Sequence, residues 1–361
     1  MRRLWRLIKW IAGTIVFLIV ALLAPAAYVE VFCRADAQAG SYDPIITQAE
    51  FQRAEANSYL TYPEWHIVYA YEDLARVLEG DDEHGFGFAG SITSFWRSFC
   101  ALNREAGRHG GADFATRSTI HVIGVSFTLE MAAKAAYEET LGRLAGLVRG
   151  QRKTVQDEYA AQMAADYGKF LHQTPWYKFD FAGHTSQLWA LPVGSSGSAF
   201  LRGWERRLAL GAEWKAKSAY AKMIANAVAA AGQAQLRIRS VIGNLQPDGL
   251  SAISGVDVVS SDDSRVVIET PRYREFTEIL KQIAARGGEV IEIAGNDEIM
   301  VSLIGPSGAN ADPQNGEVIF RAARNGSPDQ RLLVNVKLSE LADLIAEAGD
   351  GPLSLEHVYD Y

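Results

Sequence analysis

The sequence of 361 residues is poor in cysteine, with Cys33 and Cys100 as its only two thiols. Two cysteines cannot build a disulfide framework or a four-thiolate zinc site, and no C-x-x-C pair is present for redox or haem chemistry. A bond between them is conceivable in an oxidising compartment. Because Cys33 borders a long apolar run and the sequence gives no distance between the two, we expect two unrelated thiols.

The sequence also lacks the spacings of common metal and catalytic sites. None of its seven histidines lies in an H-E-x-x-H, H-x-H or E-x-x-H pattern, which removes the usual zinc-protease and di-iron arrangements. No G-x-S-x-G nucleophile motif and no Walker-type phosphate loop occurs. No motif in the sequence therefore indicates a particular reaction, and we expect neither a resident metal nor a cofactor.

Positive charge is in the minority, with 35 Lys and Arg against 43 Asp and Glu and a formal net charge of −8. Such a chain has no basic footprint for a polyanion, so we expect no nucleic-acid partner. The 48% hydrophobic content is typical of a globular protein. A chain of this length predicts two domains and a targeting segment.

An uncharged apolar run from Trp10 to Val29 follows four basic residues in the first nine positions. About 20 residues at 1.5 Å each cross a hydrocarbon core of about 30 Å. The basic residues predict a cytoplasmic tail at 1–9 and place the rest of the chain outside. We expect a signal-anchor helix at 10–32 in the bacterial inner membrane, with the bulk of the chain periplasmic.

A cleaved signal peptide is the alternative, because Ala24-Pro25-Ala26 and Ala35-Asp36-Ala37 both fit a small-x-small cleavage pattern. The apolar run is longer than the roughly 7–15 residues typical of signal peptides, which favours the anchor.

Residues 41–235 predict a helical domain that contains two pairs of similar motifs. The segments 86–96 and 179–189 both read F-x-F-A-G-x5-W, and the segments 130–137 and 213–220 both read E-x-x-A-K-x-A-Y. Because the order of the motifs is the same, we expect an internal duplication with halves at about 61–150 and 153–235. The offset falls from 93 residues to 83, so the first half carries ten extra residues, which we assign to a longer loop around 104–111.

Two local patterns in this domain give specific predictions. Thr61-Tyr62-Pro63-Glu64 has the spacing of a capping box, which predicts a helix with Thr61 as its N-cap. The charged residues of the second motif lie on largely apolar helices, where an unpaired charge is costly. We therefore expect pairing within or between the halves among Glu130, Lys134, Glu213 and Lys217.

The candidate site residues come from the same domain. Weak candidates for catalysis are Glu64, His66, Glu130 and Lys134. Candidates for binding, chosen because aromatic and charged residues lie near the repeated motifs, are Trp65, Trp96, Trp176, Trp189, Glu213 and Lys217.

After a segment at 236–255 that we expect to be a linker, the pattern changes to short strands and amphipathic helices. Strands are predicted at 256–259 and 266–269, and a hairpin at 289–304 around Gly295-Asn296-Asp297. Two further strands, a helix at 339–348 and a last strand from Leu353 complete a domain at 256–361. The order resembles a ferredoxin-like split β-α-β arrangement, so the expected fold class is α+β.

The preferred hypothesis is a single-pass inner-membrane-anchored periplasmic binding or scaffold protein that contacts the lipid bilayer and handles a lipid or a membrane-protein partner. The alternative is an envelope enzyme that acts on a lipid or glycan in a polar pocket between the helical halves. A third hypothesis is a structural subunit of a larger membrane complex.

Overall fold

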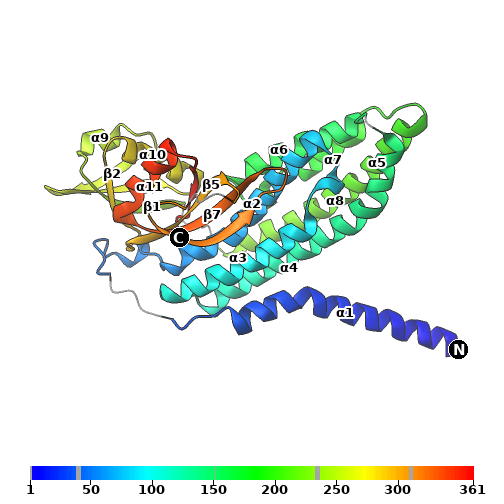
Figure 1. The fold of residues 1–361 in the computed structure, drawn as a ribbon, viewed down its shortest axis with the longest axis horizontal. Helices are drawn as coiled ribbons and strands as arrows, with labels where there is room; N and C mark the ends of the chain where they lie inside the picture. Colours follow the sequence, from blue (N-terminus) through cyan, green and yellow to red (C-terminus); the bar gives the residue numbers. More distant parts are fainter. Residues whose placement is uncertain (1, 38–41, 151, 232–235, 309–311) are drawn as a thin grey trace.

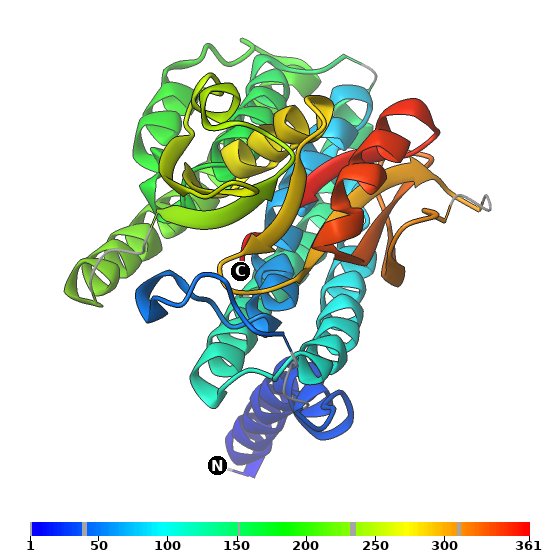
Figure 2. The ribbon, with the colours of Figure 1, turned by 90° about the vertical axis from the view of Figure 1, so that its left-hand side faces the viewer.

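The computed structural model describes residues 2–37, 42–150, 152–231, 236–308 and 312–361. The chain is α+β, with an N-terminal apolar helix, a helical body and two antiparallel sheets near the C-terminus. Figure 1 shows the sheets at one end of the helical body and helix α5 at the opposite end; Figure 2 views the molecule from the sheet end. The expected domain boundaries at 41 and 235 lie outside the described residues.

Helix α1 (Arg2–Phe32) contains a stretch from Ile8 to Phe32 that is long and apolar enough to cross a membrane, with a mean hydropathy of 2.4. Almost none of this stretch is buried against the rest of the protein. Both a membrane anchor and a signal sequence have these properties.

The C-terminal end of α1, unlike the rest of the helix, packs into the helical body. Val29 and Cys33 have no exposed surface, and Cys33 forms a disulfide with Cys100 of helix α3 (Phe88–Arg108). The Asn103 side chain donates a hydrogen bond of 2.9 Å to the Cys33 carbonyl. Our expectation of two unrelated thiols is therefore wrong, because packing of α1 on α3 brings the two Cα atoms to 5.0 Å.

The helical body has long helices joined by short ones and tight turns. Its elements are α2 (Ala56–Gly80), η2 (Glu83–Gly85), α3, α4 (Phe114–Tyr137), the π-helix η3 (Glu138–Gly142), α5 (Arg143–Arg149), α6 (Val155–Leu171), η4 (Trp176–Lys178), α7 (Phe181–Ala190) and α8 (Gly197–Ala231).

Helix α2 begins five residues before the predicted cap. Thr61 lies inside the helix, where its hydroxyl donates to the Asn57 carbonyl at 2.8 Å, so it does not cap the N-terminus. Ser58, in the added turn, is fully buried, donates to the Tyr359 carbonyl at 2.8 Å and accepts from the Met300 amide at 2.9 Å. Contacts with the C-terminal region thus extend the helix beyond its local capping signal.

The two F-x-F-A-G motifs have the same local backbone. Each follows a short 3-10 turn and places its first Phe in an extended conformation, with ψ of 134° at Phe86 and 138° at Phe179. The next residues, Gly87 and Asp180, have φ/ψ of −78°/65° and −81°/64°, and a helix begins on the second Phe of each motif. In both motifs the two phenylalanine ring centroids are 5.0 Å apart.

The ten extra residues between the first pair of motifs lie in a helix and not in a loop. Helix α3, which begins in the first F-x-F-A-G motif, has 21 residues, whereas α7, which begins in the second, has 10. The expected long loop around 104–111 is therefore wrong for its first five residues, because α3 runs on to Arg108 and packs against the end of α1.

In the described residues the C-terminal region forms two four-stranded antiparallel sheets, with strand orders β2-β3-β1-β4 and β6-β7-β5-β8. The elements are β1 (Arg237–Gly243), α9 (Pro247–Ser251), β2 (Asp257–Ser261), β3 (Arg265–Pro271), α10 (Arg274–Ala285), β4 (Glu289–Ile293), β5 (Glu298–Pro306), β6 (Glu317–Ala323), β7 (Asp329–Lys337), α11 (Leu338–Asp350) and β8 (Ser354–Val358). Their buried aliphatic side chains form one core that both sheets share with α10 and α11.

Two expectations for this region need correction. The segment at 236–255, which we expected to be a linker, contains β1, and β1 is an inner strand of the first sheet. Because β4 pairs with β1 and β5 pairs with β7 and β8, strands β4 and β5 belong to different sheets. The predicted hairpin is therefore wrong, and only an isolated bridge between Ile293 and Asn296 links its two sides.

Candidate functional site

Reciprocal ion pairs join the two E-x-x-A-K motifs across the interface between α4 and α8. Glu130 of the first motif lies 2.7 Å from Lys217 of the second, and Lys134 of the first lies 2.9 Å from Glu213 of the second. The predicted pairing is confirmed: two pairs join the two motifs, and Glu213 and Lys217 also pair within the second motif at 3.2 Å.

Tyr71 of α2 completes this group. Its hydroxyl donates to the Glu130 carboxylate and accepts from the Lys217 ammonium, which lies 4.4 Å from the centre of the tyrosine ring. The hydroxyl and the ring thus stabilise the charged forms of both partners.

The electrostatics keep Glu213, Lys134 and Lys217 ionised at neutral pH. Burial alone raises the pKa of Glu213, but the ammonium groups of Lys134 and Lys217 lower it to about 2. Burial alone lowers the pKa of each lysine, but Glu213 with Glu83 raises that of Lys134, and Glu130 with Glu213 raises that of Lys217. Groups whose pKa values lie so far from neutral pH are poor proton-transfer catalysts.

The charged cluster extends toward the end of the body that carries α5. Lys134 also pairs with Glu83 at 2.6 Å, and Arg206 pairs with Glu83 at 3.2 Å and Glu138 at 2.8 Å. Burial and the nearby Glu83 raise the pKa of Glu138 to about 7. Beyond Arg206, further buried pairs are Arg202–Asp157 at 2.8 Å and Arg149–Asp82 at 2.9 Å.

A small cavity lies between the halves at this cluster, with a volume of about 20 Å³. Its polar lining includes Tyr71, Glu83, Lys134, Tyr167, Glu213 and Lys217. That volume fits about one water molecule, whereas pockets for small-molecule ligands are typically about 300–1,000 Å³. This cavity is therefore suited to hydration of the charges.

Glu64 and His66 lie apart from this cluster. Glu64 is exposed, whereas His66 is buried and lies 3.1 Å from the Ser91 carbonyl through Nε2. Burial, with a smaller effect from Arg331, lowers the pKa of His66 to about 3, so the ring is neutral at physiological pH. Among the four weak catalytic candidates, the structure brings together only Glu130 and Lys134.

The four candidate tryptophans do not form one surface. Trp65 and Trp96 are buried, the first against His357 and the second with its indole N–H donating to Thr128. Trp176 is half-buried against Tyr220, and Trp189 is 39% exposed.

Sequence analysis missed a group of exposed apolar side chains at the end of the helical body opposite the sheets. They come from η3, α5 and the first turns of α8, and α5 contacts α8. We call this group the apolar tip; its members, each 37–74% exposed, are Leu141, Leu144, Leu147, Val148, Phe200, Leu201, Trp204 and Leu208. A spacing of i, i+3 and i+7 is visible at 141, 144 and 148 and at 201, 204 and 208, but core-facing helices show the same spacing.

Comparison of the chain with protein-family models, with curated proteins and with solved structures found no match.

Proposed function

We propose that the protein is a periplasmic binding or scaffold protein that α1 holds in the bacterial inner membrane and that contacts lipid through its apolar tip. The observation that carries this proposal is the junction between an exposed apolar helix and a folded body. Glu30 near the end of α1 lies 2.8 Å from His121 and 3.2 Å from Arg117 of α4, so the body is held close to the place where α1 leaves the bilayer.

The direction of the helices supports contact between the tip and lipid. From its junction with the body, α1 runs toward the same end of the molecule as α5 and the start of α8 (Figure 1). If α1 crosses the bilayer, the apolar tip therefore lies on the membrane side of this junction. Exposed leucines and aromatic residues on neighbouring helices suit insertion at the membrane–water interface.

The disulfide supports the periplasmic location and bears on the cleavage of α1. Disulfides persist in oxidising compartments such as the periplasm. Cleavage after Ala37 would remove Val29 and Cys33, which are buried in the body. These contacts therefore argue against cleavage after Ala37, whereas cleavage after Ala26 would leave both residues in place.

We also propose two finer features of the fold. The shared motif torsions and the reciprocal ion pairs support an internal duplication of residues 61–150 and 153–235. The order β1-α9-β2-β3-α10-β4, with β1 and β3 inside the sheet, supports a ferredoxin-like arrangement of the first sheet.

Fluorescence quenching by nitroxide-labelled lipids in nanodiscs tests the contact of the tip with the membrane. The full chain carries one introduced cysteine and a fluorophore, and the native disulfide leaves both native cysteines unreactive. Leu18→Cys in α1 is the positive control, and Val259→Cys, at a 43% exposed position in β2, is the matched negative control. We expect lipids with the nitroxide near the headgroup to quench Leu201→Cys. Quenching at 18 with none at 201 contradicts the proposal.

The alternative, an envelope enzyme with a polar pocket between the halves, has weaker support. The cavity at that place is water-sized and its charges are paired. Native mass spectrometry after mild detergent extraction distinguishes the hypotheses, because it reports bound lipid, protein partners and stoichiometry together. We expect retained phospholipid; a retained glycan substrate favours the enzyme.

A further inference from the structure

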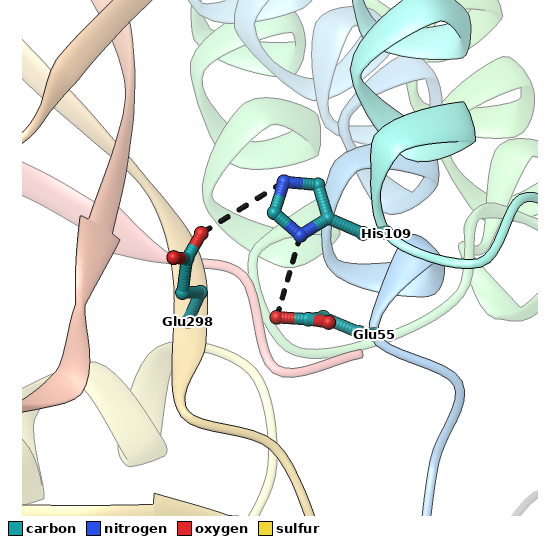
Figure 3. Close-up of side chains that lie close together, drawn as sticks. All are labelled: Glu55, His109 and Glu298. Carbon is teal, nitrogen blue, oxygen red and sulfur yellow. Dashed lines mark ion pairs between the residues drawn. The ribbon is translucent and has the colours of Figure 1, made fainter. Parts of the chain in front are cut away.

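One cluster of metal-ligating side chains lies far from the charged cluster between the helical halves. Glu55 immediately precedes α2, His109 immediately follows α3, and Glu298 is the first residue of β5 (Figure 3). One potential ligand atom from each of the three lies within 4.8 Å of the other two, and all three residues are partly buried. The cluster thus joins the helical body to the second sheet.

The separations in this cluster differ from those of the protein's close ion pairs. His109 Nδ1 lies 3.4 Å from Glu55, and its Nε2 lies 3.3 Å from Glu105 and 3.8 Å from Glu298. By contrast, Lys134 and Glu83 approach to 2.6 Å. Two ligands on one tetrahedral ion, each bonded at about 2.0–2.2 Å, lie about 3.4 Å apart. Among the proposed ligand atoms, the 3.4 Å between His109 Nδ1 and Glu55 matches this value, and one ligand atom from each of the three residues lies within 4.8 Å of the others.

The cluster has an excess of negative charge. Three carboxylates, from Glu55, Glu105 and Glu298, surround one imidazole, and the mostly exposed Arg108 pairs with Glu105 alone. The surroundings therefore favour a cation at this place.

Contacts beyond the three side chains hold them in position. The Tyr59 ring stacks on His109 with centroids 4.7 Å apart, and its hydroxyl donates to the Asn335 side chain at 2.8 Å. The Asn335 amide donates in turn to Glu298 at 2.7 Å. Metal-binding histidines and carboxylates typically have such supporting partners.

We propose that Glu55, His109 and Glu298 bind one divalent cation of the zinc class. His109 supplies Nδ1, each glutamate supplies a carboxylate oxygen, and water completes the coordination. The other ring nitrogen of His109 donates its N–H to Glu105, as metal-bound imidazoles commonly do to a carboxylate. Because the ligands come from the start of α2, the end of α3 and the start of β5, the ion fastens the helical body to the second sheet.

Isothermal titration of the full chain with zinc chloride tests this site. The protein is purified in detergent without a polyhistidine tag and treated with a chelator, which is then removed. We expect one zinc ion per chain and a loss of affinity of more than about tenfold in Glu55→Gln, His109→Gln and Glu298→Gln. His184→Gln is the matched control, because His184 bonds Tyr159 elsewhere in the body and is expected to leave zinc affinity unchanged.

Two outcomes overturn the proposal: no stoichiometric zinc uptake by the wild-type chain, or wild-type affinity in folded Glu55→Gln and Glu298→Gln. These two variants keep the size of the side chain, so they decide the result even if His109→Gln unfolds. X-ray absorption of the zinc-loaded chain gives an independent measurement. We expect a first shell of nitrogen and oxygen with a single imidazole; a shell with two or more imidazoles contradicts the assignment.

Discussion

The helical body and the C-terminal sheets each bring together two groups of elements, but the groups are joined differently. In the body, α2-η2-α3-α4 and α6-η4-α7-α8 meet through the ion pairs Glu130–Lys217 and Lys134–Glu213. In the sheets, β1 to β4 and β5 to β8 share one aliphatic core. Apolar burial is the stronger source of stability, whereas paired charges penalise any arrangement that separates them. We infer that the apolar core of the sheets supplies most of the stability. The paired charges fix the relative position of the helical halves.

Removal of apolar volume from the shared core is expected to have the largest effect. Leu344 of α11 is fully buried, so Leu344→Ala loses apolar burial and leaves a cavity. We expect the free energy of unfolding to fall by about 2–5 kcal/mol. Denaturant titration measures this effect, with Val259→Ala, at an exposed position, as the control. Equal stability of Leu344→Ala and Val259→Ala would contradict the stabilising role that we assign to the sheet core.

Removal of one charge between the halves is expected to have a smaller effect. The Lys134 side chain is 10% exposed and pairs with Glu83 and Glu213, so Lys134→Met leaves two carboxylates without this partner. We expect a loss of about 2–4 kcal/mol, measured by the same titration. Lys222→Met, at an exposed position of α8, provides the matched control and is expected to change stability by less than about 0.5 kcal/mol. Similar losses in both variants would argue against a special role of Lys134.

Acid is expected to weaken the helical body before the sheets. The pKa of Glu213 is lowered from an ordinary 4.5 to about 2, so its contribution is complete above pH 4.5 and is lost as the pH falls toward 2. Because its side chain is 22% exposed, we expect only about 1–2 kcal/mol. Circular dichroism at helical and strand wavelengths during acid titration measures the order of the two transitions. If Glu213→Gln shows the same acid transition as wild type, Glu213 does not cause it.

The sequence predicted features that depend on short-range spacing. Apolar periodicity located the strands β2 to β8 and the helix α11, and the E-x-x-A-K spacing predicted that Glu130, Lys134, Glu213 and Lys217 pair. The spacing could not tell whether the partner lay in the same half or in the other one. That choice depends on how the fold places α4 and α8 relative to each other, which no local pattern encodes.

Features that depend on long-range contacts were missed. Strand β1 precedes a Gly- and Pro-containing stretch that resembles a linker, and its role appears only when β3 and β4 pair with it. The disulfide and the Glu55–His109–Glu298 cluster join residues that are 54 or more positions apart, so they have no motif spacing. The apolar tip was missed because its spacing is the same as that of a buried helix face.

Double-mutant cycles on the pairs Glu130–Lys217 and Lys134–Glu213 test most directly whether reciprocal ion pairs hold the two helical halves together. Each cycle compares the single Gln or Met variants with the double variant by denaturant titration of the full chain. We predict favourable coupling of more than about 1 kcal/mol in both cycles, because the charged atoms of the two pairs lie only 2.7 and 2.9 Å apart. Coupling below about 0.3 kcal/mol in either cycle would contradict the account.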